Sequence, residues 1–288
     1  MDQICAQFGI TRQAHYQMVK REAHRQIEEE IIVEMVRQFR RKHPRLGTRK
    51  LLYKIQPMMV IEGLQIGRDR LFSLLRERDM LVPRKKGYRR TTIPGYWRTP
   101  NLLPGVTISQ PNQVWVCDIT YLELENSRFA YLFLLMDLFS RFIVGWHISN
   151  SLAADGATDS LQMALKKLPE MKKNFIHHSD HGVQYTSRSY MDILLQEGIR
   201  PSMGEVGNCY DNIFAERVIG TLKNEYLLDA CFTDIHQVYP AVKEAVYYYN
   251  TDRPHLSLSM AAPFDVYFGA YHDVLPVIIP ESEVYITP

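Results

Sequence analysis

The sequence has few cysteines and no long apolar run. Its four cysteines, at positions 5, 117, 209 and 231 of 288 residues, are scattered and include no C-x-x-C pair. This spacing argues against a disulfide framework and a zinc site, and it indicates reduced thiols in a cytoplasmic protein. No run of about 18 apolar residues occurs, so we expect no membrane span. The opening segment "MDQICAQFGI" also lacks the basic and then apolar order of a secretory signal.

Internal repeats, low-complexity segments and a sustained heptad repeat are also lacking, which argues against a solenoid or a long coiled coil. An uneven distribution of charge, however, is present. Residues 1–100 hold 22 Lys and Arg against 10 Asp and Glu, and residues 101–288 hold 12 against 22. The formal net charge of +2 therefore hides a basic part suited to a polyanion and an acidic part suited to cations. A chance imbalance on two solvated surfaces is the alternative.

Residues 1–82 have the apolar spacing of short helices, with the size and rhythm of a helix-turn-helix region. Thr11 is placed to cap a helix after the break at Gly9. Two further helices are predicted from "RLGTRKLLYKIQ" and "IGRDRLFSLLRERDML", and Arg68 and Arg70 begin the second of them. A recognition helix presents such side chains to a DNA groove. A small helical bundle that binds protein is the alternative.

Residues 83–110 are rich in proline, cations and aromatic residues and have no helical or strand period. We predict a basic linker that follows a phosphate backbone. The predicted DNA contacts of the N-terminal part are Arg12, Arg68, Arg70, Lys85, Lys86, Arg89 and Arg90.

Residues 111–270 have the pattern of an α/β domain. Three apolar strands, "QVWVCDITYL", "FAYLFLLMDLF" and "RFIVGWHIS", come before a helix, the strand "NFIHHSD", a helix, the strand "RPSM" and another helix. This order predicts a mixed sheet flanked by helices. The chain after Pro263 is expected to be irregular, and residues 271–288 are taken as a C-terminal tail.

Two acidic residues of this domain, Asp118 and Asp180, occupy positions in or next to apolar strands, where acidic side chains are uncommon. Asp118 interrupts a buried apolar strand, where a carboxylate is unfavourable unless it is paired or binds a cation. Its neighbours Cys117 and Ile119 are expected to point to the opposite face of the sheet. Asp180 comes just after a strand, at the usual place for a site on such a sheet. With a third acid they could hold two Mg²⁺ ions, the arrangement used for phosphoryl transfer.

Candidates for the third acid are Asp137, Asp211, Glu216 and Glu225. Asp211 is explained as a helix cap, and Asp137 as a structural partner of Arg141. Glu225 lies about 180° away from Glu216 on a helix, so the two cannot serve one site.

Glu216 is not a capping-box glutamate, because Ile213 occupies the position that would need a capping side chain. Periodicity places Glu216 opposite the apolar arc of Phe214, Val218 and Leu222, on the same side as Lys223. A plain solvent-facing acid therefore stays open on the local pattern.

The blocks "WVCDITYL", "HSDHGVQY" and "SMGEVGNCYDNIFAERVIGTLKNE" resemble the catalytic blocks of the IS3-family insertion-sequence transposases, which have an OrfB-type integrase core. The segments "HPRLGTRKL", "LLRERDML" and "YNTDRPHLSLSMAAP" extend the resemblance over roughly residues 1–265. Asp180 and Glu216 have 35 residues between them, the D,D(35)E spacing of that family.

The resemblance implies an RNase H-like fold and a triad of Asp118, Asp180 and Glu216 that binds Mg²⁺, with Mn²⁺ as a substitute. It also implies DNA strand cleavage and transfer at the terminal repeats of an insertion sequence, a homo-oligomer on DNA, and an upstream OrfA-type partner or fusion. Lys223 is the expected DNA contact in the site, and His178, His181 and Gln184 are weaker candidates beside Asp180. A nuclease without joining activity and a catalytically silent DNA-binding regulator or partner subunit are the alternatives.

Overall fold

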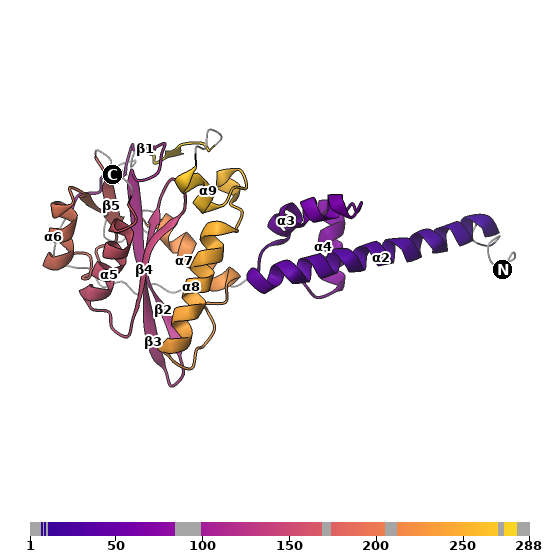
Figure 1. Cartoon of the computed structure of the whole chain (residues 1–288), viewed down its shortest axis with the longest axis horizontal. Helices are drawn as coiled ribbons and strands as arrows, with labels where there is room; N and C mark the ends of the chain where they lie inside the picture. The colour runs from indigo at the N-terminus through magenta and orange to yellow at the C-terminus, as the bar shows by residue number, and fades with distance from the viewer. Residues whose placement is uncertain are drawn as a thin grey trace, which may run out of the picture. The chain divides into compact units, whose positions relative to one another are not determined.

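The computed structural model describes residues 7, 9, 11–83, 99–168, 174–204, 212–269 and 274–280. The chain forms two compact units, Met1–Lys86 and Gly87–Pro288. The described part of the first is helical, and the second is built on a sheet (Figure 1). Within the described residues, no helix combines the length and the hydropathy needed to cross a bilayer.

The described part of the first unit consists of α2 (Arg12–Lys42), α3 (Thr48–Ile61) and α4 (Arg68–Glu77). Thr11 caps α2 as predicted, because the Ala14 amide donates to its hydroxyl at 3.1 Å. The helix predicted after the break at Gly9 continues to Lys42 as α2, one helix of 31 residues. It contains no glycine or proline and is rich in helix-forming residues, so nothing local breaks it.

The core of this unit joins the C-terminal half of α2 to α3 and α4. Its buried apolar residues are Ile32, Val33, Met35, Val36, Leu46, Leu51, Ile55, Met59, Leu64, Leu71, Leu74 and Leu75. Gly63 ends α3 with a φ of +67°, which glycine adopts without strain, and α4 begins after Gly67. The helices α3 and α4 are the two further helices predicted from the sequence, and a short turn joins them.

A five-stranded mixed sheet forms the centre of the second unit, in the order β4-β3-β2-β5-β6. Its strands are β2 (Val114–Leu124), β3 (Arg128–Asp137), β4 (Ile143–Ser149), β5 (Ile176–Ser179) and β6 (Arg200–Met203). The pairs β2–β3 and β3–β4 are antiparallel, and β2–β5 and β5–β6 are parallel. This topology is the RNase H-like fold, and the predicted order of strands and helices is confirmed.

Helices cover both faces of the sheet (Figure 1). One core packs α5 (Ala154–Leu165) and α6 (Arg188–Gln196) on the sheet, and the other packs α7 (Ile213–Glu225) and α8 (Ile235–Thr251) on the opposite face. Two layers of helices therefore enclose a sheet whose central strand carries Asp118.

The chain after Pro263 was predicted to be irregular, and that prediction is wrong. It forms α9 (Pro263–Phe268), and β7 (Val277–Ile278) pairs antiparallel with β1 (Thr107–Ile108). Two residues are too few to show the period of a strand in the sequence. The partner strand also lies about 170 residues earlier in the chain, so no local pattern indicates the pairing.

Gly145 of β4 marks the closest approach of α5 to the sheet. A Cβ there would lie 2.2 Å from the Ser160 carbonyl oxygen, and a backbone atom cannot easily yield. We expect Gly145→Ala to lower the free energy of unfolding by about 1–3 kcal/mol through overpacking. Urea denaturation measures this. Gly220→Ala is the matched control, because nothing lies within 4 Å of a Cβ on this helical glycine. This change should raise the free energy of unfolding by about 0.5–1 kcal/mol. Equal effects would contradict the close packing.

Candidate functional site

Asp118 lies in the middle of β2, on the face of the sheet that α7 and α8 cover. Val114 and Val116, which share its side of the strand, pack in the core with these helices. Cys117 and Ile119 pack in the other core, with α5 and α6. The Ile119 amide donates to the Asp118 carboxylate at 2.8 Å. The alternation predicted from sequence is thus confirmed, and Asp118 faces α7.

Asp180 follows the end of β5 and lies beside Asp118. The parallel register pairs Val116 with His178, and two residues further along it brings Asp180 level with Asp118. The Gly182 amide donates to Asp180 Oδ1 at 3.0 Å. A Cβ on Gly182 would lie 2.9 Å from that oxygen, so the turn after β5 wraps closely around the carboxylate.

Glu216 and Lys223 come from α7. The Asn212 side chain, just before the helix, donates to the Cys117 carbonyl at 3.1 Å and fixes the start of α7 beside Asp118. Glu216 lies one turn further on, and its amide donates to the Asn212 carbonyl at 3.1 Å. Its side chain is exposed, whereas Lys223, two turns along the same face, is half-buried.

These four side chains interact electrostatically around Asp118. Burial, the charge of Asp180 and, to a smaller extent, the charge of Glu216 raise the pKa of Asp118 to about 8, against the opposing effects of the Ile119 amide and Lys223. Burial lowers the pKa of Lys223, and Asp118 opposes that shift. The carboxylates therefore repel one another in the absence of a bound cation.

The donor chemistry of the three acids fits a hard divalent cation. Carboxylate oxygens are the ligands that Mg²⁺ takes in proteins, and a cation would relieve their repulsion. Among the residues that the structure describes, no three His, Cys, Asp or Glu side chains stand close enough to share one ion. Because Glu216 is exposed, its side chain would have to turn toward Asp118 to complete a site.

Asp137 has a structural role. Its buried carboxylate accepts the Asn112 amide at 2.8 Å, the Ser140 amide at 2.8 Å and the Ser140 hydroxyl at 2.5 Å. Burial raises its pKa to about 6, and these donors and the charge of Arg141 act against the rise. The sequence predicted Arg141 as its partner, but the direct donors are backbone and hydroxyl groups that local spacing does not reveal.

Glu225 also lies outside the acidic cluster, as its helical angle predicted. Both of its carboxylate oxygens accept from Arg253, at 2.7 and 2.8 Å, and Arg253 is 5% exposed. Arg253 follows α8, so this ion pair joins the C-terminal end of α7 to the chain beyond α8. This contact was not predicted from the sequence, because the pairing of two residues 28 apart leaves no local signal.

The neighbours of Asp180 mostly support the scaffold. His178 is fully buried with Nδ1 2.9 Å from the Ser202 hydroxyl, and Gln184 donates to the Leu152 carbonyl at 2.8 Å. His181 is half-buried. Asp211, the predicted helix cap, lies outside the described residues.

The predicted DNA contacts of the N-terminal part have varied surroundings. Arg70 binds Glu29 at 2.7 and 2.8 Å and thereby joins α4 to α2, and Arg68 binds the neighbouring Asp69 at 2.8 Å. The Arg12 guanidinium lies 5.7 Å from the centre of the Tyr16 ring. Lys85, Lys86, Arg89 and Arg90 lie outside the described residues. A role in DNA binding stays a prediction for all seven.

Comparison with known proteins identifies the sheet unit as similar to integrase cores. Two families described as "Integrase core domain" match residues 108–209 and 197–263. An insertion element IS600 protein of 31 kDa from Shigella sonnei is 32% identical over 90% of this chain and 96% of its own length. The transposase InsF for insertion sequence IS3A of Escherichia coli is 43% identical over 41% of this chain and 40% of its own length.

A solved structure, the HTLV-2 integrase catalytic core domain in complex with magnesium, is 18% identical. The match covers 58% of this chain and 99% of that one, with a TM-score of 0.43.

Proposed function

This chain belongs to the insertion-sequence transposases with an integrase core domain, and from this premise we propose that Asp118, Asp180 and Glu216 form its metal-binding D,D(35)E triad. A DDE transposase is a polynucleotidyl transferase that acts in DNA transposition. The observation that carries the proposal is the shared electrostatic environment of the three acids and Lys223 around Asp118. The function proposed is metal-dependent strand cleavage and strand transfer at the ends of an insertion sequence.

Each residue of the cluster has a distinct role in this proposal. Asp118 and Asp180, fixed on neighbouring strands, provide the rigid ligands, and Glu216 closes the site from α7. Bound there, Mg²⁺ (or Mn²⁺ in its place) would activate a water or a DNA 3′-hydroxyl and stabilise the leaving 3′-oxygen at phosphorus. Lys223 holds a DNA phosphate beside the carboxylates. The reaction needs no covalent enzyme–DNA bond.

A strand-transfer assay tests the function. The protein is incubated with Mg²⁺ and a candidate terminal DNA that ends in a pre-cut 3′-hydroxyl. We expect a joined product with the wild type and none with Glu216→Gln, because the amide is a poor ligand for a hard cation. Glu244→Gln is the matched control: this exposed glutamate lies on α8, and its replacement should leave the yield unchanged.

The other outcomes separate the alternatives. Hydrolysis without any joined product would favour a nuclease of this fold and contradict strand transfer. Normal DNA binding with no cleavage, even with an OrfA-type partner added, would favour a silent DNA-binding subunit. Full activity of Glu216→Gln would remove Glu216 from the triad.

A further inference from the structure

The N-terminal half of α2 carries an apolar stripe that faces away from the core of the helical unit. Its residues are Tyr16, Val19, Ala23, Ile27 and Ile31. They recur every three or four positions, so they lie within about 120° of the helix surface. Tyr16 is 52% exposed, Val19 50% and Ile27 61%. The core residues of the same helix, such as Ile32 and Val36, point the opposite way.

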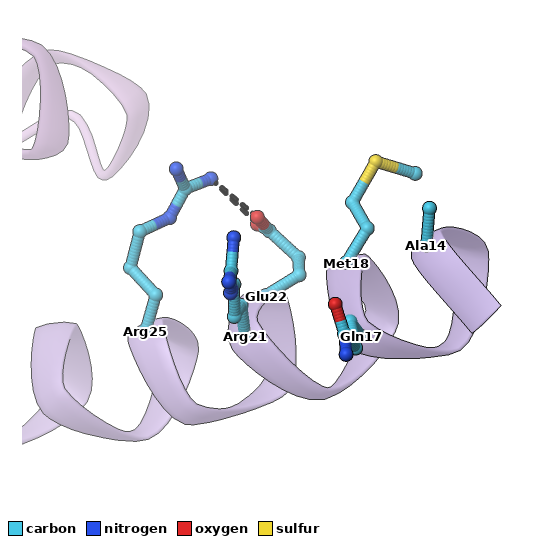
Figure 2. Close-up of a pocket in the computed structure, with 6 residues that line it drawn as sticks. All are labelled: Ala14, Gln17, Met18, Arg21, Glu22 and Arg25. Carbon is cyan, nitrogen blue, oxygen red and sulfur yellow. Dashed lines mark hydrogen bonds and ion pairs between the residues drawn. The ribbon is translucent and has the colours of Figure 1, made fainter. Parts of the chain in front are cut away.

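The face opposite the stripe carries both polar and apolar side chains. A hollow of about 310 Å³ lies there, lined by Ala14, Gln17, Met18, Arg21, Glu22 and Arg25, whose side chains are drawn in Figure 2. Arg25 and Glu22 are paired at 2.6 Å across its rim. All six residues belong to α2 alone, so the hollow has one wall and no convergent groups for a small ligand. The apolar stripe is therefore the surface of this helix segment that needs a macromolecular partner.

Charge along α2 indicates what that partner is. The exposed residues Arg12 and Lys20 flank the stripe near the start of the helix, and the exposed residues Glu30 and Glu34 flank it further on. A second copy of the same helix, turned end to end, would place the basic start of each stripe beside the acidic part of the other stripe. A parallel arrangement would place like charges together, which is unfavourable.

We propose that two copies of this chain pair through the stripe, with their α2 helices antiparallel and crossing at Ala23. Positions equally spaced about residue 23 then meet: Val19 contacts Ile27 of the second copy, and Arg12 contacts Glu34. The small Ala23 side chains at the centre allow close approach of the backbones. Glu34 lies 3.4 Å from Arg37 in its own chain, but an exposed pair of this kind is weak and can be exchanged.

Sedimentation of the full chain over a range of concentrations tests the pairing, independently of any reaction at the carboxylates. We expect a monomer–dimer equilibrium in the wild type. Val19→Glu should weaken it by about 100-fold, since each dimer loses two buried valines. Val60→Glu is the matched control, because Val60 is 72% exposed on α3 of the same unit, and it should leave the dimerisation constant unchanged. Circular dichroism checks that both variants keep their helices.

Charge exchange tests the antiparallel direction. Arg12→Glu alone and Glu34→Arg alone should each weaken the dimer by about 10-fold, since each turns two attractive contacts into repulsive ones. A mixture of the two variants, or the double variant, should restore it. A wild type that stays monomeric, or a dimerisation constant that these changes leave unaltered, would overturn the proposal. Loss of DNA affinity with unchanged dimerisation would assign the stripe to DNA instead.

Discussion

Replacement of Asp118 by Asn is expected to abolish DNA cleavage and joining, with a loss of roughly 10³-fold or more in rate. In the proposed site Asp118 is the ligand on the central strand of the sheet, and its loss removes several kcal/mol of metal-dependent stabilisation of the transition state. The rate is measured with pre-cut terminal DNA and Mg²⁺. Asp192→Asn is the control, because Asp192 is an exposed acid on α6, and it should leave the rate unchanged.

Thermal unfolding separates loss of a ligand from loss of the fold. Without divalent cations, Asp118→Asn should unfold at the same temperature as the wild type or a higher one, because it removes a carboxyl group whose ionised form is disfavoured in the folded protein by burial and by Asp180. Added Mg²⁺ should raise the unfolding temperature of the wild type and not that of the variant. A variant that retains more than about a tenth of the rate, or the full response to Mg²⁺, would contradict the assignment of Asp118 as a ligand.

The sequence predicted the parts of this site that depend on local pattern. Asp118 was identified because an acid inside an apolar strand is unusual, and the alternation along β2 correctly placed Cys117 and Ile119 on the other face. Helical angles correctly removed Glu225 from the cluster. These inferences needed only the periods of strands and helices.

The remaining features depend on long-range contacts. The parallel pairing of β2 with β5 brings Asp118 level with Asp180, and no local period specifies which strands are neighbours. Phe214 was predicted in the buried arc of α7, but it is only half-buried, with the Arg141 guanidinium 4.9 Å from the centre of its ring. Ile27 and Ile31 recur at helical spacing, as the core residues of α2 do, and yet their side chains are exposed. The reason is that α3 and α4 pack on the other face of α2.

Replacement of Arg253 by Ala should destabilise the sheet unit by about 3 kcal/mol. Removing one member of a buried ion pair leaves the other charge without compensation, and such changes are strongly destabilising. The Arg253 side chain is 6% exposed and that of Glu225 is 21% exposed, so water relieves only part of the penalty. The guanidinium also contacts His255 at 2.8 Å and lies 5.5 Å from the centre of the Tyr249 ring.

Urea denaturation of the Arg253 variants and of a control variant at Arg188 measures this effect. Arg253→Lys should recover only part of the loss, because an ammonium group cannot bind both carboxylate oxygens as the planar guanidinium does. The matched control is Arg188→Ala on α6, which breaks a pair at 3.7 Å with Asp192 whose arginine is 95% exposed. It should change stability by less than about 0.5 kcal/mol. Equal effects of the two alanine variants would contradict a structural role for Arg253.

The same ion pair should influence the reaction, because Glu225 ends the helix that carries Glu216 and Lys223. At a temperature where Arg253→Ala is still folded, looser anchoring of α7 should lower the rate of strand transfer by about 10-fold, since small misplacements of catalytic groups have large effects. Binding of DNA should change less than the rate. The double variant Glu225→Gln, Arg253→Met removes both charges and should be more stable than Arg253→Ala, yet it should stay slow, because the helix end remains unanchored. Recovery of the full rate in the double variant would show that charge balance, and not the position of α7, is what the pair provides.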